Sequence, residues 1–564
     1  MKQIIKNTLR ASAFIVALGM VSCDALDLAP IDYYGDGNFW KRKEHVVSYM
    51  DGLHKNLRDK IFRHQYELGE ARGGTSKMGT AVDGTSLNYQ SMVSQRLTSE
   101  DPGITGFGDY YGVIANVNIF LQKTKEADYM EESEKSYYLA QAYGLRAFYY
   151  FDLYRTYGTA PLRLDPNEVV NGNFNPEDLY MERASGSKLM TQIKADLAES
   201  MRLFGDNNSF DPESRGNKKS YWSKAATEYL AAEVYLWNAK VSVDDNAANE
   251  ADLAIAKQHC QSLMDNYGLS LMDNYADIFD VEHKGNSEII MAIRYMEGEA
   301  SNSNGTYMYN YQTGAWKTIG YNDENGNAMG DTLQVRTSGM QRIEYLPEFF
   351  FAYEKGRDSR RDVNFLSAYS KTDNSFLGTV FKKIMGHLNA NTNSYIWDAD
   401  AVLYRLAGVY FMMAEIANME GGDVAQYINP IRKRAYGASW NEATDAYVNG
   451  DFTQNELAIL AEKDKEMLGE GQRWYDLNRM MLTKGGGHLV FCKEGSKDGQ
   501  APILNKSTEA YKVFWPIETE MLNKDPKLVQ TPGYENAAVR SEEHTSELQS
   551  RVDLVCRHLL EKKK

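Results

Sequence analysis

Aromatic rings interleaved with small polar side chains form the clearest binding chemistry in this sequence, and they gather in residues 305–326. In an extended backbone alternate side chains share one face, so the alternating tyrosines would lie side by side with amide and hydroxyl groups around them. A tyrosine can bury its ring while its hydroxyl stays in water. The segment therefore predicts a binding surface. Its aromatic residues are Tyr307, Tyr309, Tyr311, Trp316 and Tyr321.

Trp316 is the strongest single candidate, because its neighbours in residues 314–317 do not form a core-like run. The alternative is that these rings only fasten a long loop to the scaffold, and the sequence leaves both interpretations open for each tyrosine. A second segment, residues 69–108, has a similar loop-like character. Ordered loops of this length are usually functional. We therefore add three of its residues to the candidate surface: Arg72, Asn88 and Tyr89.

Catalytic and metal-binding motifs are missing from the sequence. It contains no G-x-S-x-G, no H-E-x-x-H, no paired C-x-x-C and no phosphate loop. None of the nine histidines has metal-ligand spacing, and the acids of residues 322–326 do not fit a calcium loop, so we interpret this segment as a turn. A glycosidase needs only two carboxylates at the right separation. Among 78 acidic residues such a pair cannot be dismissed by motif, so a helical glycoside hydrolase stays as an alternative.

The charge and cysteine content narrow the class of protein. With 62 Lys and Arg against 78 Asp and Glu, the formal charge is -16, which argues against nucleic-acid binding because a phosphate backbone requires a basic surface. Four cysteines are too few for a disulfide scaffold. Only Cys260 and Cys492 lie away from the two ends of the chain, and the sequence does not decide whether they pair.

Residues 1–22 have the form of an export signal, with basic residues before an apolar run and small residues before Cys23. The apolar run is too short to span a bilayer. The string MVSC resembles a bacterial lipobox, in which the cysteine thiol is diacylated, and two acyl chains anchor a protein durably. The alternative is an ordinary signal peptide followed by a chance cysteine. We expect lipid attachment at Cys23.

Residues 540–564 resemble a translated sequencing adapter more than native protein, and the alternative is a basic amphipathic tail helix. We leave them out of the fold, which places the native C-terminus near Val539.

Helical periodicity dominates the rest of the chain. Three stripes, in residues 132–157, 220–239 and 403–418, carry apolar residues at i, i+3, i+4 and i+7, with alanines beside large rings. This alternation is typical of antiparallel helix pairs stacked in a solenoid. We expect the pairs 116–123 with 132–157, 187–204 with 220–239, and 403–418 with 424–435, and a strand within 286–295. The predicted class is mainly α, a tetratricopeptide-like superhelix of helix pairs with long loop insertions and a few short strands. Since such arrays usually bind peptides, a peptide-binding scaffold is a further alternative.

Several strings in these helices resemble the SusD/RagB family of Bacteroidetes outer-membrane lipoproteins, and they occur in the family's order between Cys23 and Tyr534. The start, CDALDLAP, is also similar to the family's start after its acylated cysteine. The strings are AYGLRAFYYFDLYRTYGTAPL, AATEYLAAEVYLW, RRDVNF, LYRLAGVYFMMAEIAN followed by INPIRKRA, LAEKDKEMLGEGQRWYDLNR and FWPIETEMLNKDPKLVQTPGY.

The resemblance implies one SusD-like domain, residues 23–539, with an N-terminal and a central loop-rich insertion. It implies a non-catalytic protein on the outer face of the outer membrane, which binds a nutrient glycan and serves as the lid of a SusC-like TonB-dependent transporter. An early loop segment contributes to the same ligand surface in the family. No cofactor is implied; some relatives hold a structural Ca²⁺, which the sequence does not assign here. Neither the sugar nor the choice between glycan and peptide can be read from the sequence.

Charged residues within the matching strings are expected to be structural. Arg146 lies on an apolar stripe and should pair with a carboxylate of a neighbouring helix, with Glu233 as a candidate. Arg473 and Asp476 are likewise expected to serve the scaffold, not the ligand site.

Overall fold

The computed structural model describes residues 39–78, 89–104, 106–166, 176–216, 219–302, 321–330, 332–334 and 343–534. The signal segment, Cys23 and residues 540–564 lie outside these ranges.

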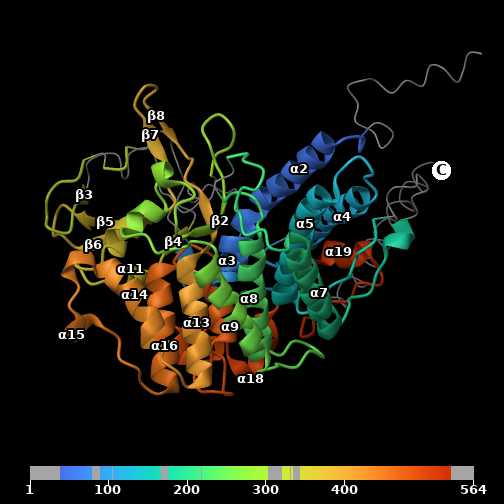
Figure 1. Cartoon of the computed structure of the whole chain (residues 1–564). Coiled ribbons are helices and arrows are strands. Elements are labelled where there is room, and N and C mark those ends of the chain that lie inside the picture. The colour runs from blue at the N-terminus through green and yellow to red at the C-terminus, as the bar shows by residue number, and fades with distance from the viewer. Residues whose placement is uncertain are drawn as a thin grey trace, which may run out of the picture.

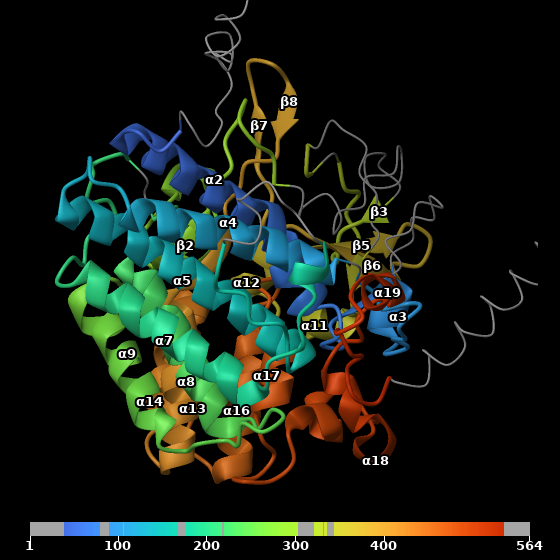
Figure 2. The ribbon, with the colours of Figure 1, turned by 90° about the vertical axis from the view of Figure 1, so that its right-hand side faces the viewer.

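Antiparallel helices form the body of the molecule, and successive helices pack on one another (Figure 2). The first group is α2 (Lys43–Phe62), α4 (Phe107–Lys125), α5 (Glu132–Tyr157), α7 (Gly186–Phe204), α8 (Lys224–Lys240) and α9 (Asp252–Asn266). The second group is α13 (Leu406–Glu420), α14 (Ala425–Tyr436), α16 (Phe452–Glu466) and α17 (Arg473–Arg479). Helix α13 joins the groups by packing on α8 and α9. The predicted class and the three predicted pairs are confirmed, except that residues 401–405 form a strand and α13 begins at Leu406.

Small residues let the helices approach each other, as the alternation of alanine and large rings predicts. A Cβ atom on Gly144 of α5 would lie 2.1 Å from the indole nitrogen of Trp222, and one on Gly408 of α13 would lie 2.0 Å from the hydroxyl of Tyr229. Neither position has room for a side chain. Each glycine therefore leaves space for an aromatic ring, which a larger residue would displace.

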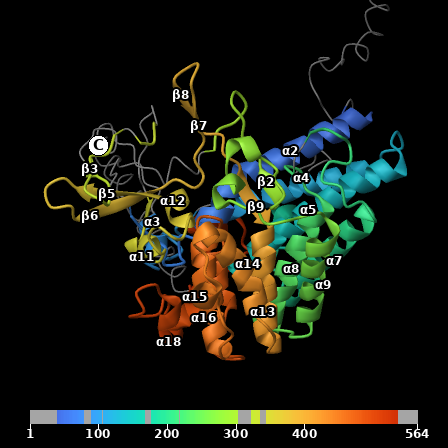
Figure 3. The ribbon, with the colours of Figure 1, turned by 60° about the vertical axis from the view of Figure 1, so that its left-hand side comes forward.

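Short antiparallel strands gather at one end of the helices (Figures 1 and 3). Strand β2 (Ile289–Ile293) pairs with β9 (Ala401–Arg405), which confirms the strand predicted within 286–295. Strand β1 (Ser76–Met78) pairs with β4 (Ile343–Tyr345), and β7 (His387–Asn389) with β8 (Ser394–Ile396). A three-stranded sheet has the order β3 (Tyr321–Asn322), β5 (Phe365–Ser370) and β6 (Phe376–Phe381). The shorter helices are α3 (Tyr89–Val93), α11 (Pro347–Phe351), α12 (Arg360–Asn364), α15 (Glu442–Asp445), α18 (Lys506–Glu509) and α19 (Thr519–Lys524).

A buried ion network, which we call the central network, joins the strands to the second helix group. Its centre is Arg405, at the end of β9, whose guanidinium lies 2.7 Å from carboxylate oxygens of Glu288, Glu466 and Glu470. Burial by itself would raise the pKa of Glu466, but the neighbouring arginines outweigh it and hold that pKa below its ordinary value. The other cations of the network are Arg360, Arg434 and Lys383.

The expected partner of Arg146 is wrong, although its structural role is confirmed. Arg146 donates two hydrogen bonds, of 2.8 and 2.7 Å, to the carboxylate of Asp196 on α7. Glu233 instead accepts a hydrogen bond of 2.7 Å from Arg155, which lies further along α5. Both acids are on helices that pack against α5, so only the position along the helix decides which arginine each one meets.

Arg473 and Asp476 are buried in scaffold contacts, as predicted. Arg473 pairs with Asp464 and donates to the backbone carbonyls of Gly73 and Gly495. Asp476 accepts from Lys463 and Arg479.

Cys260 and Cys492 are both free thiols. None of the helices in the described ranges is long and apolar enough to cross a membrane.

Replacing Arg405 by methionine should lower the free energy of unfolding by about 3–5 kcal/mol, because three buried carboxylates lose their shared cation. Urea unfolding followed by circular dichroism measures this loss. The matched control is Lys257→Met, since Lys257 pairs with Glu420 at the surface, where an ion pair contributes about 0–1 kcal/mol. Equal stability losses in the two variants would contradict the structural role of the central network.

Candidate ligand-binding surface

The two loop-rich segments predicted to bind a ligand are fastened to the same end of the molecule. Strand β1 leads into residues 79–88, and strand β4 follows residues 335–342. Because β1 pairs with β4 from Ser76–Tyr345 to Met78–Ile343, the early segment starts where the central insertion returns to the scaffold. The structure thus places the start of one segment beside the end of another that is far away in the sequence.

Residues 303–320 are held at both flanks. On one side, Asn302 donates its backbone N–H to the carbonyl of Trp397 at 2.7 Å and its side-chain amide to the carbonyl of Ala399 at 2.9 Å. On the other side, Tyr321 pairs with Ser370 in the three-stranded sheet. The segment therefore connects the base of the β7–β8 hairpin to the edge of the β3–β5–β6 sheet.

The base of the early segment is tied to the second helix group. The Glu70 carboxylate accepts a hydrogen bond of 3.2 Å from the backbone N–H of Gly471. A Cβ atom on Gly69 would lie 2.2 Å from the carbonyl oxygen of Gly471, so the two backbones touch at this point. Burial raises the pKa of Glu70 to about 8, since the hydrogen bond from Gly471 and the charge of Arg473 only partly offset it. Glu70 is therefore a buried carboxylic acid that keeps its proton at neutral pH.

Arg72 is buried at the base of the early segment and does not lie on an exposed surface. Its guanidinium lies over the rings of Trp474 and Trp515, at 4.2 and 5.0 Å from their centres, and it donates to Gln95 at 2.8 Å. The side chain has no exposed surface, so it has no face to offer a ligand. The expectation that Arg72 contacts a ligand is therefore wrong, because its side chain is fully buried.

The other predicted residues fall into two groups. Tyr321 is half-buried in β3, at the edge of its sheet, and Tyr89 begins α3, next to the early segment. The remaining predicted contacts lie outside the described residues, and they are Tyr307, Tyr309, Tyr311, Trp316 and Asn88.

Two rings that the sequence analysis missed stand beside Asn302. Tyr395 of β8 and Trp397 form an edge-to-face pair with ring centres 5.0 Å apart, and both are half-buried. The Tyr395 hydroxyl donates to the carbonyl of Gly386 at 2.9 Å. In the string NSYIWDAD the two rings are two residues apart, like the tyrosines of residues 307–311, and polar residues flank them; this spacing was the available signal.

Polar groups lie on the same hairpin as these rings and on the segments next to it. The amide of Asn389 on the hairpin donates to Glu297 at 3.0 Å, and the imidazole of His387 lies 3.0 Å from the carboxylate of Asp398. Arg294 pairs with Asp400 at 2.9 Å. Rings with carboxylate, amide and guanidinium groups at their edges can hold a polar ligand that also has an apolar face.

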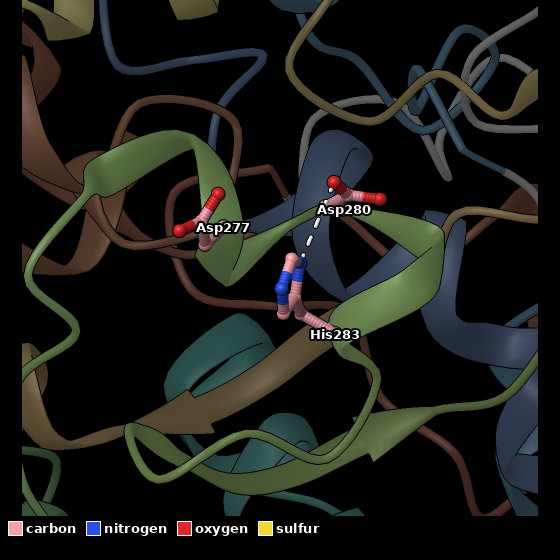
Figure 4. A group of neighbouring side chains, drawn as sticks. All are labelled: Asp277, Asp280 and His283. Atoms are coloured by element: carbon pink, nitrogen blue, oxygen red, sulfur yellow. Dashed lines mark ion pairs between the residues drawn. The ribbon is translucent and has the colours of Figure 1, made fainter.

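Within the described ranges, one group of side chains has the proximity of metal ligands: Asp277, Asp280 and His283 (Figure 4). These groups already serve local structure. The Asp280 carboxylate accepts from the backbone N–H of Glu282 and lies 3.4 Å from His283, while Asp277 accepts from the amide of Asn274. We therefore assign no metal to the group.

Comparison with known proteins shows matches in both halves of the chain. Residues 353–534 match the model described as SusD family, and residues 42–236 match the model described as starch-binding associating with outer membrane. The crystal structure of a SusD superfamily protein from Bacteroides fragilis is 48% identical and has a TM-score of 0.82, covering 88% of this chain and 100% of that chain.

Two further relatives are similar over most of their length. The structure of NanU from B. fragilis is 30% identical with a TM-score of 0.75, covering 90% of this chain and all of that chain. The starch-binding protein SusD of Bacteroides thetaiotaomicron is 23% identical over 473 residues, which are 75% of this chain and 76% of that protein.

Replacing Glu70 by glutamine should flatten the pH dependence of stability. Because the folded state raises this pKa from an ordinary 4.5 to about 8, the folded state holds the proton more tightly than the unfolded chain does. The contribution of Glu70 is thus fully present below pH 4.5 and is lost as the pH rises towards 8, by an amount on the order of a few kcal/mol.

Urea unfolding of the parent and Glu70→Gln at several pH values between about 5 and 8 measures this effect, with the exposed Glu348→Gln as the matched control. The free-energy difference between Glu70→Gln and the parent should grow with pH. A difference that stays constant with pH would show that Glu70 titrates normally.

Proposed function

We propose a glycan-binding role for this chain, which belongs to the SusD family. The observation that carries the proposal is the 48% identity to a SusD superfamily structure that the chain covers completely. The family consists of glycan-binding proteins without catalytic activity, so we assign no reaction to the chain. The fold agrees with this role, because a rigid helical body carries loops that can differ without destabilising it.

The ligand surface in this proposal is formed by the two loop segments together with the β7–β8 hairpin. Sugar rings expose C–H faces that pack on aromatic rings, while their hydroxyls need hydrogen-bonding partners at the edge. Residues 303–320 supply such rings, with Trp316 as the principal contact, and Tyr395 and Trp397 extend the surface at the hairpin. The candidate contacts retained from the sequence are Tyr307, Tyr309, Tyr311, Tyr321, Asn88 and Tyr89.

We further propose that the chain is anchored in the outer membrane by lipid on Cys23, faces outward, and passes its glycan to a SusC-like TonB-dependent transporter. The lipobox-like string at Cys23 supports the anchor, and a family model described as associating with outer membrane supports the location. Isolation of an equimolar barrel protein with the chain, from outer membranes dissolved in mild detergent, tests the transporter. Recovery of the chain alone would remove that part of the proposal.

Affinity electrophoresis through gels containing starch, laminarin, xylan, mannan or pectin tests the central role, combined with an assay for reducing ends. A glycan-binding protein is retarded by at least one polysaccharide and releases no sugar. Release of reducing ends would favour the hydrolase, and indifference to every polysaccharide would favour the peptide-binding scaffold.

Trp316→Ala should weaken binding to the polysaccharide that retards the parent by about 1–3 kcal/mol, the usual effect of truncating a central aromatic contact. The melting temperature should change little, because we expect the residue to lie on a loop that contributes little to stability. Isothermal titration and thermal melting measure the two effects. Trp440→Ala is the matched control, since Trp440 is a half-buried tryptophan next to α15 that is not part of the proposed surface. Unchanged affinity, or a lower melting temperature, would show that Trp316 has a structural role and does not contact the ligand.

Cys23→Ala should release the protein from membranes, because the acyl chains can no longer be attached. Cell fractionation followed by immunoblotting measures the partition between membrane and soluble fractions. Cys492→Ala leaves the lipobox intact and is the control. Membrane partition that survives Cys23→Ala would contradict the anchor.

A further inference from the structure

A hollow opens beside helix α2, apart from the rings described above. Its volume is about 480 Å³, within the range of small-molecule sites. One wall is the part of α2 from Asp51 to Arg58, and the other is formed by Tyr221 and the segment that leaves β2 at Ile293. The side chains that line it are largely polar, which suits a ligand rich in hydroxyl groups more than an apolar one.

The charged groups of this hollow are held in place before any ligand arrives. Arg58 donates to the carboxylate of Glu299 at 2.6 Å, which fixes the far wall against α2. Asp51 accepts from the hydroxyl of Tyr221 at 2.6 Å and from the guanidinium of Arg215 at 2.9 Å. Two carboxylates and a guanidinium in fixed positions can share hydrogen bonds with neighbouring hydroxyls, and groups that are already ordered lose little entropy on binding.

His54 forms the floor as a neutral ring. Its Nε2 accepts the backbone N–H of Trp222 at 2.9 Å, so Nδ1 carries the proton and donates to the carbonyl of Met50 at 3.0 Å. Burial lowers the pKa of His54 to about 4, which the hydrogen bond to Met50 only partly offsets. The ring therefore adds no charge to the hollow, and it rests against Tyr221 with ring centres 4.5 Å apart.

Gly52 leaves the hollow open on the side of α2. It lies in the interior of the 20-residue helix α2, where glycine costs about 1 kcal/mol relative to alanine. Its backbone conformation does not require glycine, and a Cβ atom there would meet no atom within 4 Å. The same is true of Gly112 inside α4, so open space alone does not explain the choice of glycine. Because Gly52 lines the hollow, however, a larger side chain at this position would take up space at its mouth.

One short segment of the chain joins the hollow to the base of the β7–β8 hairpin. Residues 294–300 carry Arg294 and Glu299 on the side of the hollow. Glu297 of the same segment accepts from Asn389 of the β7–β8 hairpin, and Asn302 follows at the base of that hairpin. One extended ligand can thus contact both sides of this segment.

We infer that the hollow beside Gly52 is a subsite for one neutral sugar residue of the bound glycan, held by hydrogen bonds to Asp51, Arg58 and Glu299. The inference rests on the proposed glycan-binding function and adds a second point of contact to it.

The test compares Gly52→Leu with Gly112→Leu. Gly112 is also inside a helix, α4, with no atom within 4 Å of an added Cβ, but it does not line the hollow. Leucine is a better helix former than glycine, so neither variant should melt earlier than the parent. Titration calorimetry uses the polysaccharide, among starch, laminarin, xylan, mannan and pectin, that retards the parent in affinity electrophoresis.

We expect Gly52→Leu to bind that polysaccharide at least about tenfold more weakly, since about 1.4 kcal/mol corresponds to tenfold, and Gly112→Leu to bind like the parent. Glu299→Gln should also weaken binding. Because it changes one exposed side chain, it still tests the subsite if Gly52→Leu does not fold. Parent-like binding by Gly52→Leu and Glu299→Gln, with glycan binding intact, would overturn the subsite alone. A parent that binds none of the five polysaccharides would overturn the proposed function and the subsite together.

Discussion

The shared ion pairs of Arg405 are the constraint on which the rest of the structure depends. This guanidinium ends strand β9 and contacts Glu288 before β2, Glu466 at the end of α16 and Glu470 in the turn that follows. Burying charges is costly unless each is paired and hydrogen-bonded, so these four segments must meet in one arrangement. The pairing between β2 and β9 and the position of α16 follow from that requirement.

Both loop segments start from elements that the central network holds. Strand β2 continues into residues 294–302. Asn302 contacts the base of the β7–β8 hairpin, and residues 303–320 follow it in the chain. Glu470 is followed by Gly471, whose N–H binds Glu70 at the base of the early segment. A ligand surface made of loops can be specific only if its supports do not move. The buried charges supply that rigidity, which leaves the loops free to carry the residues that recognise a ligand.

Much of the fold could be predicted from the sequence because helices leave a periodic signal. The stripe at residues 132–157, with its alanines beside large rings, correctly indicated close antiparallel packing. Residues 401–405 were harder, because a fully buried strand has the same apolar composition as the start of a buried helix. The partner of Arg146 depended on position along α7 and α8, which composition does not reveal.

The site was less predictable for a related reason. Arg72 looked like a loop residue in the sequence, but two tryptophans from the far end of the chain enclose it, a long-range contact that no local pattern records. Tyr395 and Trp397 could have been found by their two-residue spacing, which puts both rings on one face of an extended backbone. Their proximity to Asn302 could not, since it depends on pairing between distant segments.

The claim that two distant loop segments form one glycan surface is tested most directly by hydrogen exchange of the full chain, with and without a polysaccharide that retards it in a gel. We expect peptides from residues 79–88 and 303–320 to gain protection together, while peptides from α9 exchange at the same rate in both conditions. Protection of only one segment, or protection confined to the helices, would contradict a single surface built from both.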